Sequence, residues 1–174
     1  MRNTGPVVRR INAAARRGWL DLGWMRLPCA LGRAGTRCRK HEGDGATPIG
    51  AWSLGMVLWR ADRGRRPVTG LPVCRIRRRD GWCDAPFDRN YNRAVRHPYP
   101  ASAERLWRDD CLYDVVVVLD YNWRPRIQGR GSAIFVHVAR SGLAPTEGCI
   151  ALAERDLRRL LLRVAPGARL VIGS

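Results

Sequence analysis

The feature that most constrains the fold is an uninterrupted apolar run, Val115–Leu119, in which four β-branched valines are followed by a leucine. Branched side chains favour a pleated sheet over a helix, so this run predicts a buried and central strand. Shorter apolar stretches between glycine and proline turns predict a hairpin over residues 19–31 and strands over 52–59, 71–79, 133–138 and 169–172. Helices are predicted over residues 101–109 and 152–164. The expected fold class is therefore α+β, mostly β with a few helices.

Length and composition favour one globular domain. A chain of 174 residues can bury one ordinary core, and a hydrophobic content of 45% with 27% charged residues is typical of a soluble protein. Residues 1–18 are basic and predict a poorly structured lead-in, so the folded domain is expected over residues 19–174. No run of about 18 apolar residues occurs, so no membrane span is expected. The N-terminus shows no apolar core of signal-peptide length.

The net charge of +17 comes almost wholly from arginine, since Lys40 is the only lysine. Guanidinium groups bind carboxylates and phosphates through paired hydrogen bonds, so nucleic acid, an anionic membrane and an anionic cell-wall polymer are all compatible partners. Nucleic acid is not expected, because neither zinc-finger spacing nor the aromatic motif of ribonucleoprotein domains supports it.

Four of the six cysteines form two pairs, Cys29 with Cys38 and Cys74 with Cys83. Structural zinc sites use tighter cysteine pairs than these, so no metal ion is expected. Disulfide bonds stay open, because they depend on the compartment and the sequence does not pair them.

Chemistry is expected in residues 133–149. His137 lies near the end of a predicted strand, and Cys149 follows after a loop punctuated by glycine and proline. A thiol becomes a good nucleophile when an imidazole holds it as thiolate, and a strand followed by a loop can bring the two groups together. Gly148 would allow a tight turn that leaves backbone amides free to face an oxyanion.

This segment resembles the catalytic signature of the L,D-transpeptidases of bacterial peptidoglycan, the YkuD-like domain. The family pattern is a histidine on a strand, then Ser/Thr-His-Gly-Cys followed by a hydrophobic residue and an arginine. The residues that match are His137, Thr146, Gly148, Cys149 and Ile150. Glu147 stands where a second histidine is usual and Ala151 where an arginine is usual, which indicates a divergent branch. Residues 47–52 also resemble the family's Thr-Pro-x-Gly-x-aromatic element, which predicts a rigid turn near the cleft.

The resemblance implies a single-domain β-sandwich or barrel with a C-terminal helix and a closing strand. It implies acyl transfer without a cofactor, with Cys149 as nucleophile, His137 as base and Gly148 at the oxyanion site. Thr146 and Glu147 would contact the substrate. The implied partners are peptidoglycan stem peptides, as donor and as acceptor. A monomer in the periplasm or cell envelope is expected, with a cytoplasmic location as the alternative.

Further substrate-binding residues are expected outside this segment. Residues 81–93 are loop-like and mix aromatic, acidic and basic side chains. Within them, Tyr91, Asn92 and Arg93 are predicted to line the substrate groove, with a solvated surface loop as the alternative. Arg140, which flanks the strand that carries His137, is a candidate for a substrate carboxylate.

Two other functions stay open. A cysteine peptidase or L,D-carboxypeptidase would let water resolve the same acyl-enzyme, and a non-catalytic basic protein would bind nucleic acid. The product of a transpeptidase also stays open. It could join two third residues, join a third residue to the first of a neighbour, or exchange a terminal D-amino acid.

Overall fold

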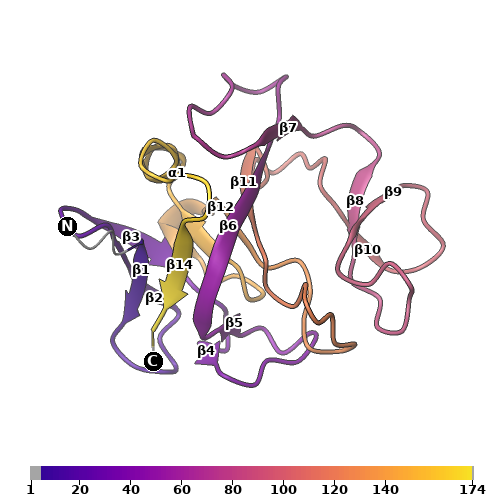
Figure 1. The fold of residues 1–174 in the computed structure, drawn as a ribbon, viewed down its shortest axis with the longest axis horizontal. Coiled ribbons are helices and arrows are strands. Elements are labelled where there is room, and N and C mark those ends of the chain that lie inside the picture. The colour runs from indigo at the N-terminus through magenta and orange to yellow at the C-terminus, as the bar shows by residue number, and fades with distance from the viewer. Residues whose placement is uncertain (1–4, 174) are drawn as a thin grey trace.

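A sheet that closes on itself forms the body of the protein (Figure 1). The computed structural model describes residues 5–173. In spatial order, the strands of this nine-stranded sheet are β11 (Val115–Leu119), β12 (Phe135–Val138), β13 (Ile150–Leu152), β3 (Arg26–Ala30), β2 (Arg17–Asp21), β1 (Val7–Arg10), β14 (Arg169–Ile172), β6 (Gly50–Trp59) and β7 (Val73–Arg75). Because β11 also pairs with β6, the sheet forms a single-domain barrel, with β7 as an added edge. The predicted fold class is confirmed.

Strand β11 is buried on both faces, which explains its unbroken apolar sequence. Val115, Val117 and Leu119 point into the barrel core, while Val116 and Val118 join a second apolar cluster outside it. All five residues are at most 1% exposed. Burying one such side chain contributes roughly 1.5–3 kcal/mol, so this strand is a major part of the fold's stability. The prediction of a central strand is confirmed.

One helix, α1 (Glu154–Leu161), lies against the barrel beside β12 and β13. Its buried side chains Leu157, Leu160 and Leu161 follow the i, i+3, i+4 spacing of an amphipathic helix. Glu154 in the first turn interacts favourably with the helix dipole. The helix is shorter than the predicted span 152–164, because Ile150–Leu152 extends as β13 beside β12.

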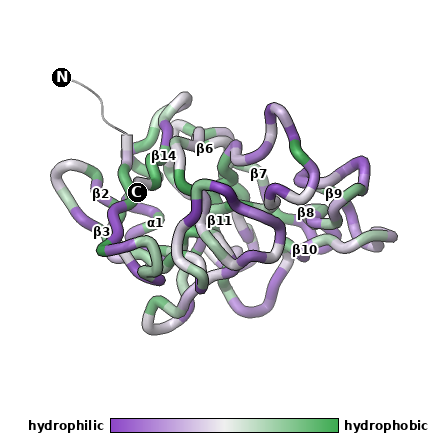
Figure 2. The backbone as a smooth tube through the Cα atoms, turned by 90° about the horizontal axis from the view of Figure 1, so that it is seen from below, coloured by the Kyte–Doolittle hydropathy of each residue, from purple (hydrophilic) through white to green (hydrophobic). Residues whose placement is uncertain are grey.

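A smaller sheet covers the second apolar cluster. It consists of β10 (Ala103–Arg105), β8 (Asp80–Cys83) and β9 (Ala94–Arg96), and it projects from one side of the barrel, as Figure 2 shows from below. Trp82 of this sheet packs edge-on against Phe135 of β12. A two-stranded sheet of β4 (Thr36–Arg37) and β5 (Thr47–Pro48) lies at one end of the barrel (Figure 1).

Two structural predictions are wrong. The predicted helix over residues 101–109 contains strand β10 instead, because Ala103–Arg105 pairs with β8 and turns Glu104 toward Tyr113. The predicted lead-in contains strand β1, which inserts between β2 and β14. Residues 1–4 of that segment lie outside the described residues.

The remaining strand predictions agree in place and differ in length. The hairpin over residues 19–31 is β2 and β3, and β14 occupies the predicted closing position. The strand over 71–79 is shorter than predicted, because only Val73–Arg75 pairs, with β6.

In the described part of the chain, no helix has the length and apolar character needed to cross a membrane.

Candidate active site

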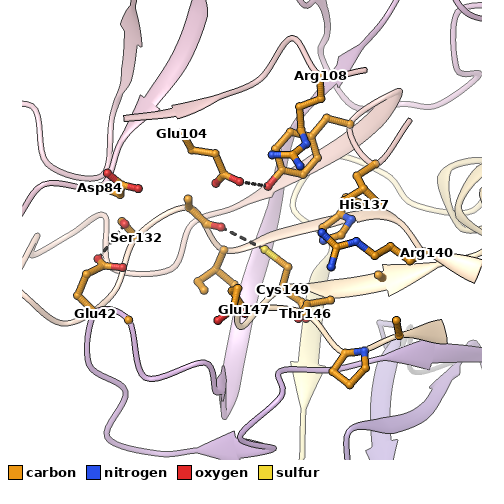
Figure 3. Close-up of a pocket in the computed structure, with 18 of the residues that line it drawn as sticks. Glu42, Asp84, Glu104, Arg108, Ser132, His137, Arg140, Thr146, Glu147 and Cys149 are labelled. Carbon is orange, nitrogen blue, oxygen red and sulfur yellow. Dashed lines mark hydrogen bonds between the residues drawn. The ribbon is translucent and has the colours of Figure 1, made fainter. Parts of the chain in front are cut away.

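A cavity of about 450 Å³ lies between the outer face of the barrel and the smaller sheet. His137 is on β12, on the same face as Phe135, and Cys149 immediately precedes β13. Both side chains line this cavity, as Figure 3 shows. The parallel pairing of β12 with β13 therefore brings together the two residues that the sequence singles out.

The Cys149 thiol is held by backbone groups of the segment that enters β12. The Phe135 amide donates to its sulfur at 3.4 Å, and the thiol donates to the Ala133 carbonyl oxygen at 3.2 Å. Burial raises the pKa of Cys149 to about 12, and the Glu104 carboxylate acts in the same direction. The Phe135 amide and the Lys40 ammonium oppose this shift. The sulfur is therefore a neutral thiol at rest.

The His137 imidazole is fixed in one tautomer. Its Nδ1 lies 2.8 Å from the Val138 carbonyl oxygen. Because a carbonyl oxygen only accepts, Nδ1 carries the proton and Nε2 keeps its lone pair. Burial lowers the pKa of His137 to about 4, so the ring is neutral at pH 7. Among the described residues no hydrogen bond joins the imidazole to Cys149, so the two groups share a cavity as a neutral pair.

Thr146 braces the turn before the nucleophile. Its hydroxyl donates to the Cys149 carbonyl oxygen at 2.7 Å and accepts from the Gly148 amide at 3.1 Å. Gly148 has a φ of +132°, and an added Cβ there would lie 2.8 Å from the Ala46 carbonyl oxygen. Only glycine fits this position without strain. Since the Gly148 amide is already bonded to Thr146, it is not free for an oxyanion as the sequence suggests.

The two positions that depart from the expected signature lie in different surroundings. Glu147 accepts from Arg33 at 2.7 Å, and its side chain is 77% exposed, so its carboxylate points to solvent. Such an exposed ion pair contributes at most about 1 kcal/mol. Ala151 pairs with His137 across the β12–β13 ladder and lines the floor of the cavity.

Charges of opposite sign flank the Cys149 sulfur. Figure 3 shows Arg108 and Arg140 on the side of His137. On the other side lie three carboxylates that the sequence did not single out, Glu42, Asp84 and Glu104. Burial raises the pKa of Glu104, whose carboxylate accepts from the Tyr113 hydroxyl. Oxygen Oδ1 of Asp84 is buried with no hydrogen-bond partner in the described residues.

Tyr91, Asn92 and Arg93 are not among the residues that line the cavity, and the burial of Tyr91 and Asn92 corrects their predicted place along a substrate groove. Tyr91 is fully buried, and its hydroxyl donates to Glu42 and accepts from the Gly131 amide. Asn92 is buried between the Trp82 indole, which donates to it, and backbone carbonyls. Arg93 is exposed. The polar character of this loop serves internal hydrogen bonds.

Among residues 5–173, no group of three or more His, Cys, Asp or Glu side chains is arranged to hold a metal ion. The described cysteines are all free thiols.

Comparison with known protein families shows a match over nearly the whole chain. The model of the YkuD family, the L,D-transpeptidase catalytic domain, matches residues 9–172 of the chain. Comparisons with curated proteins and with solved structures gave no significant match.

Proposed function

Because the chain belongs to the YkuD family of L,D-transpeptidase catalytic domains, we propose that it transfers acyl groups between peptidoglycan stem peptides through a thioester on Cys149. One observation carries this proposal. Among residues 5–173, Cys149 is the only free thiol that lines the cavity, and it shares this cavity with an imidazole whose Nε2 is unprotonated.

The first half-reaction forms the thioester. Cys149 attacks the carbonyl carbon of the third stem residue, and His137 Nε2 takes the thiol proton as the carbon–sulfur bond forms. The peptide C–N bond then breaks, and the same proton passes from the imidazole to the departing amine of the terminal D-amino acid. Since both groups start neutral, the proton moves during attack rather than before substrate binds.

The second half-reaction consumes the thioester. The amine of a second stem peptide attacks the acyl carbon, a new C–N bond forms, and the carbon–sulfur bond breaks. His137 accepts a proton from the attacking amine and returns one to the sulfur. The energy of one amide bond passes to another, so the reaction needs no nucleotide.

The tetrahedral intermediate carries a negative oxygen that requires a donor. Among the described residues the Cys149 amide donates no hydrogen bond, and it is the donor we assign to this oxygen. One donor of this kind contributes roughly 3 kcal/mol to the transition state in comparable sites.

The charges around the sulfur suit peptides that carry both signs. Arg108 and Arg140 are positioned for a substrate carboxylate, and Asp84 and Glu104 for an ammonium group. Stem peptides with a diamino acid present both groups, so the proposed substrates match the cavity. This function belongs in the cell envelope, where such peptides lie.

Incubation of the purified protein with a stem tetrapeptide, followed by mass spectrometry, tests the proposal. Loss of the terminal residue together with a cross-linked dimer is expected, and a Cys149 acyl-enzyme should be trapped at short times. Cys149→Ala should abolish both products. Tripeptide without dimer or amino-acid exchange would instead identify a carboxypeptidase, and DNA binding that is unaffected by Cys149→Ala, without muropeptide products, would identify a nucleic-acid-binding protein.

A further inference from the structure

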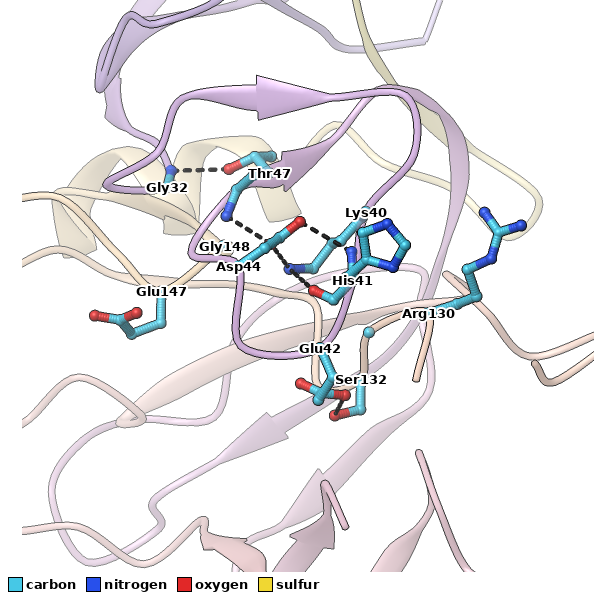
Figure 4. Close-up of polar contacts among 12 residues, drawn as sticks. Gly32, Lys40, His41, Glu42, Asp44, Thr47, Arg130, Ser132, Glu147 and Gly148 are labelled. Atoms are coloured by element: carbon cyan, nitrogen blue, oxygen red, sulfur yellow. Dashed lines mark hydrogen bonds and ion pairs between the residues drawn. The ribbon is translucent and has the colours of Figure 1, made fainter. Parts of the chain in front are cut away.

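Lys40, the only lysine of the chain, is buried beside the proposed nucleophile. Its side chain is 3% exposed, and it lines the same cavity as Cys149. Figure 4 shows it on the loop between β4 and β5, with its side chain near Gly148. An ammonium group taken out of water costs several kcal/mol unless its surroundings compensate, so this placement calls for a compensating role or partner.

Two glycines make room for the Lys40 side chain. An added Cβ at Gly131 would lie 2.9 Å from Lys40 Cε, and an added Cβ at Gly148 would lie 3.3 Å from Nζ. Both glycines have positive φ angles, +100° and +132°. The ammonium is thereby brought next to the backbone of the residue that precedes Cys149.

Asp44 holds the ammonium in this place. Lys40 Nζ donates to Asp44 Oδ1 at 2.6 Å and, more weakly, to the His41 carbonyl oxygen at 3.4 Å. The Asp44 carboxylate in turn accepts from the backbone amides of His41 and Ala46 at 2.9 Å each. Asp44 is thus satisfied by several donors and fixes Nζ, while the third ammonium proton has no partner among the described residues.

We propose that Lys40 is an electrostatic positioning residue, whose ammonium stabilises the negative charge that develops at Cys149, first on sulfur and then on the substrate oxygen. The neighbouring Gly148 amide is occupied by Thr146, so the backbone supplies fewer donors here than the turn would otherwise offer. A fixed positive charge in a site with little water acts more strongly than the same charge in solution. The field of Lys40 also opposes the effect of burial on the Cys149 thiol.

The catalytic role of Lys40 rests on the proposed function, but its effect on the Cys149 thiol can be tested without transpeptidation. The rate at which iodoacetamide alkylates Cys149 follows the thiolate fraction, and peptide mapping by mass spectrometry separates it from the other cysteines. The exposed Cys74 lies outside the cavity and is the internal control. The main variant is Lys40→Met with Asp44→Asn, which removes the ion pair without leaving an unpaired carboxylate.

The double variant should alkylate at Cys149 about tenfold more slowly at each pH from 7 to 9, equal to a rise of about one pKa unit, with Cys74 unchanged. Asp44→Asn alone keeps the ammonium and should alkylate at least as fast as the original protein. If the double variant does not fold, Lys40→Gln with Asp44→Asn, whose amides can bond to each other, carries the same measurement.

An unchanged Cys149 rate in a folded double variant would overturn the role of Lys40, as would equal slowing in Asp44→Asn alone or equal slowing at Cys74. A slowed Cys149 in a protein that makes no muropeptide product would leave the Lys40 inference standing and refute the proposed function only.

Discussion

Cys149 and His137 are both neutral in the resting protein, which bears on the state of the nucleophile. The sequence pattern suggests a thiolate held by a charged imidazole, whereas burial moves the two pKa values in the directions that oppose this ion pair. The neutral thiol dominates at every pH below its pKa of about 12, so the thiolate fraction should rise with pH throughout the pH range in which the rate can be measured.

We therefore predict that alkylation of Cys149 by iodoacetamide accelerates about tenfold per pH unit from pH 7 to 10 without reaching a plateau. The measurement is the site-specific alkylation rate by mass spectrometry. A rate that is already constant below pH 8 would indicate a preformed thiolate and contradict the neutral pair.

Asp84 carries a second prediction at the residue scale. Its buried Oδ1 lacks a hydrogen-bond partner, and its negative charge lies near that of Glu104. Asp84→Asn keeps the shape of the side chain and removes its charge, so the free energy of unfolding should stay equal or rise by up to about 1 kcal/mol.

If the Asp84 carboxylate binds the substrate amine, the KM of Asp84→Asn for an amine acceptor should rise about tenfold, while the rate of acyl-enzyme formation changes little. Glu154→Gln, on the exposed face of α1 and outside the cavity, is the charge-matched control; a KM equal to that of this control would remove Asp84 from the site.

The loop between β8 and β9 carries a prediction at the element scale. The Tyr91 hydroxyl joins Glu42 to the Gly131 amide, so it links this loop to the glycine-rich segment before β5. Tyr91→Phe should lower the free energy of unfolding by about 1–3 kcal/mol, because it leaves the buried Gly131 amide without an acceptor and removes one of the donors to the half-buried Glu42 carboxylate. Chemical denaturation measures this value.

Arg93 lies two positions along the same loop and is exposed. Arg93→Ala should change neither the free energy of unfolding nor KM. An altered KM would place Arg93 in the substrate groove after all.

Sequence patterns predict those structural elements that depend on residues close together in the chain. The β-branched run of β11, the helical spacing of α1 and the Gly148 turn before Cys149 are visible in the chain because each depends on neighbouring residues. The polar half of the cavity is not visible in this way. Glu104 reaches the site only because β10 pairs with β8, and Lys40 only because two distant glycines leave space for its side chain. The single lysine in a glycine-rich segment is the one signal that could have drawn attention to it.

Closure of the barrel depends on the N-terminal strand. β1 pairs with β2 in antiparallel and with β14 in parallel register, so it joins the first part of the chain to the last. Its basic sequence resembles a solvated tail, because only Val8 of this strand is fully buried, while Arg9 is exposed and Arg10 half-buried. The barrel is therefore a property of the whole chain, which the local composition of residues 1–18 does not reveal.

The importance of β1 can be measured with one matched pair of variants. Val8 is 0% exposed within the core, so Val8→Ala should lower the free energy of unfolding by about 2 kcal/mol from lost burial and a residual cavity. For a domain of this size that corresponds to a fall in Tm of roughly 4–8 °C. Arg9→Ala changes the adjacent position, whose side chain is 61% exposed, and should shift stability by less than about 0.5 kcal/mol. Equal and negligible effects of the two substitutions would show that β1 is dispensable. A marked loss of stability in Val8→Ala alone would show that the barrel needs β1. Removal of residues 1–10 should then expose the edges of β2 and β14, which pair with β1, and abolish cooperative thermal unfolding.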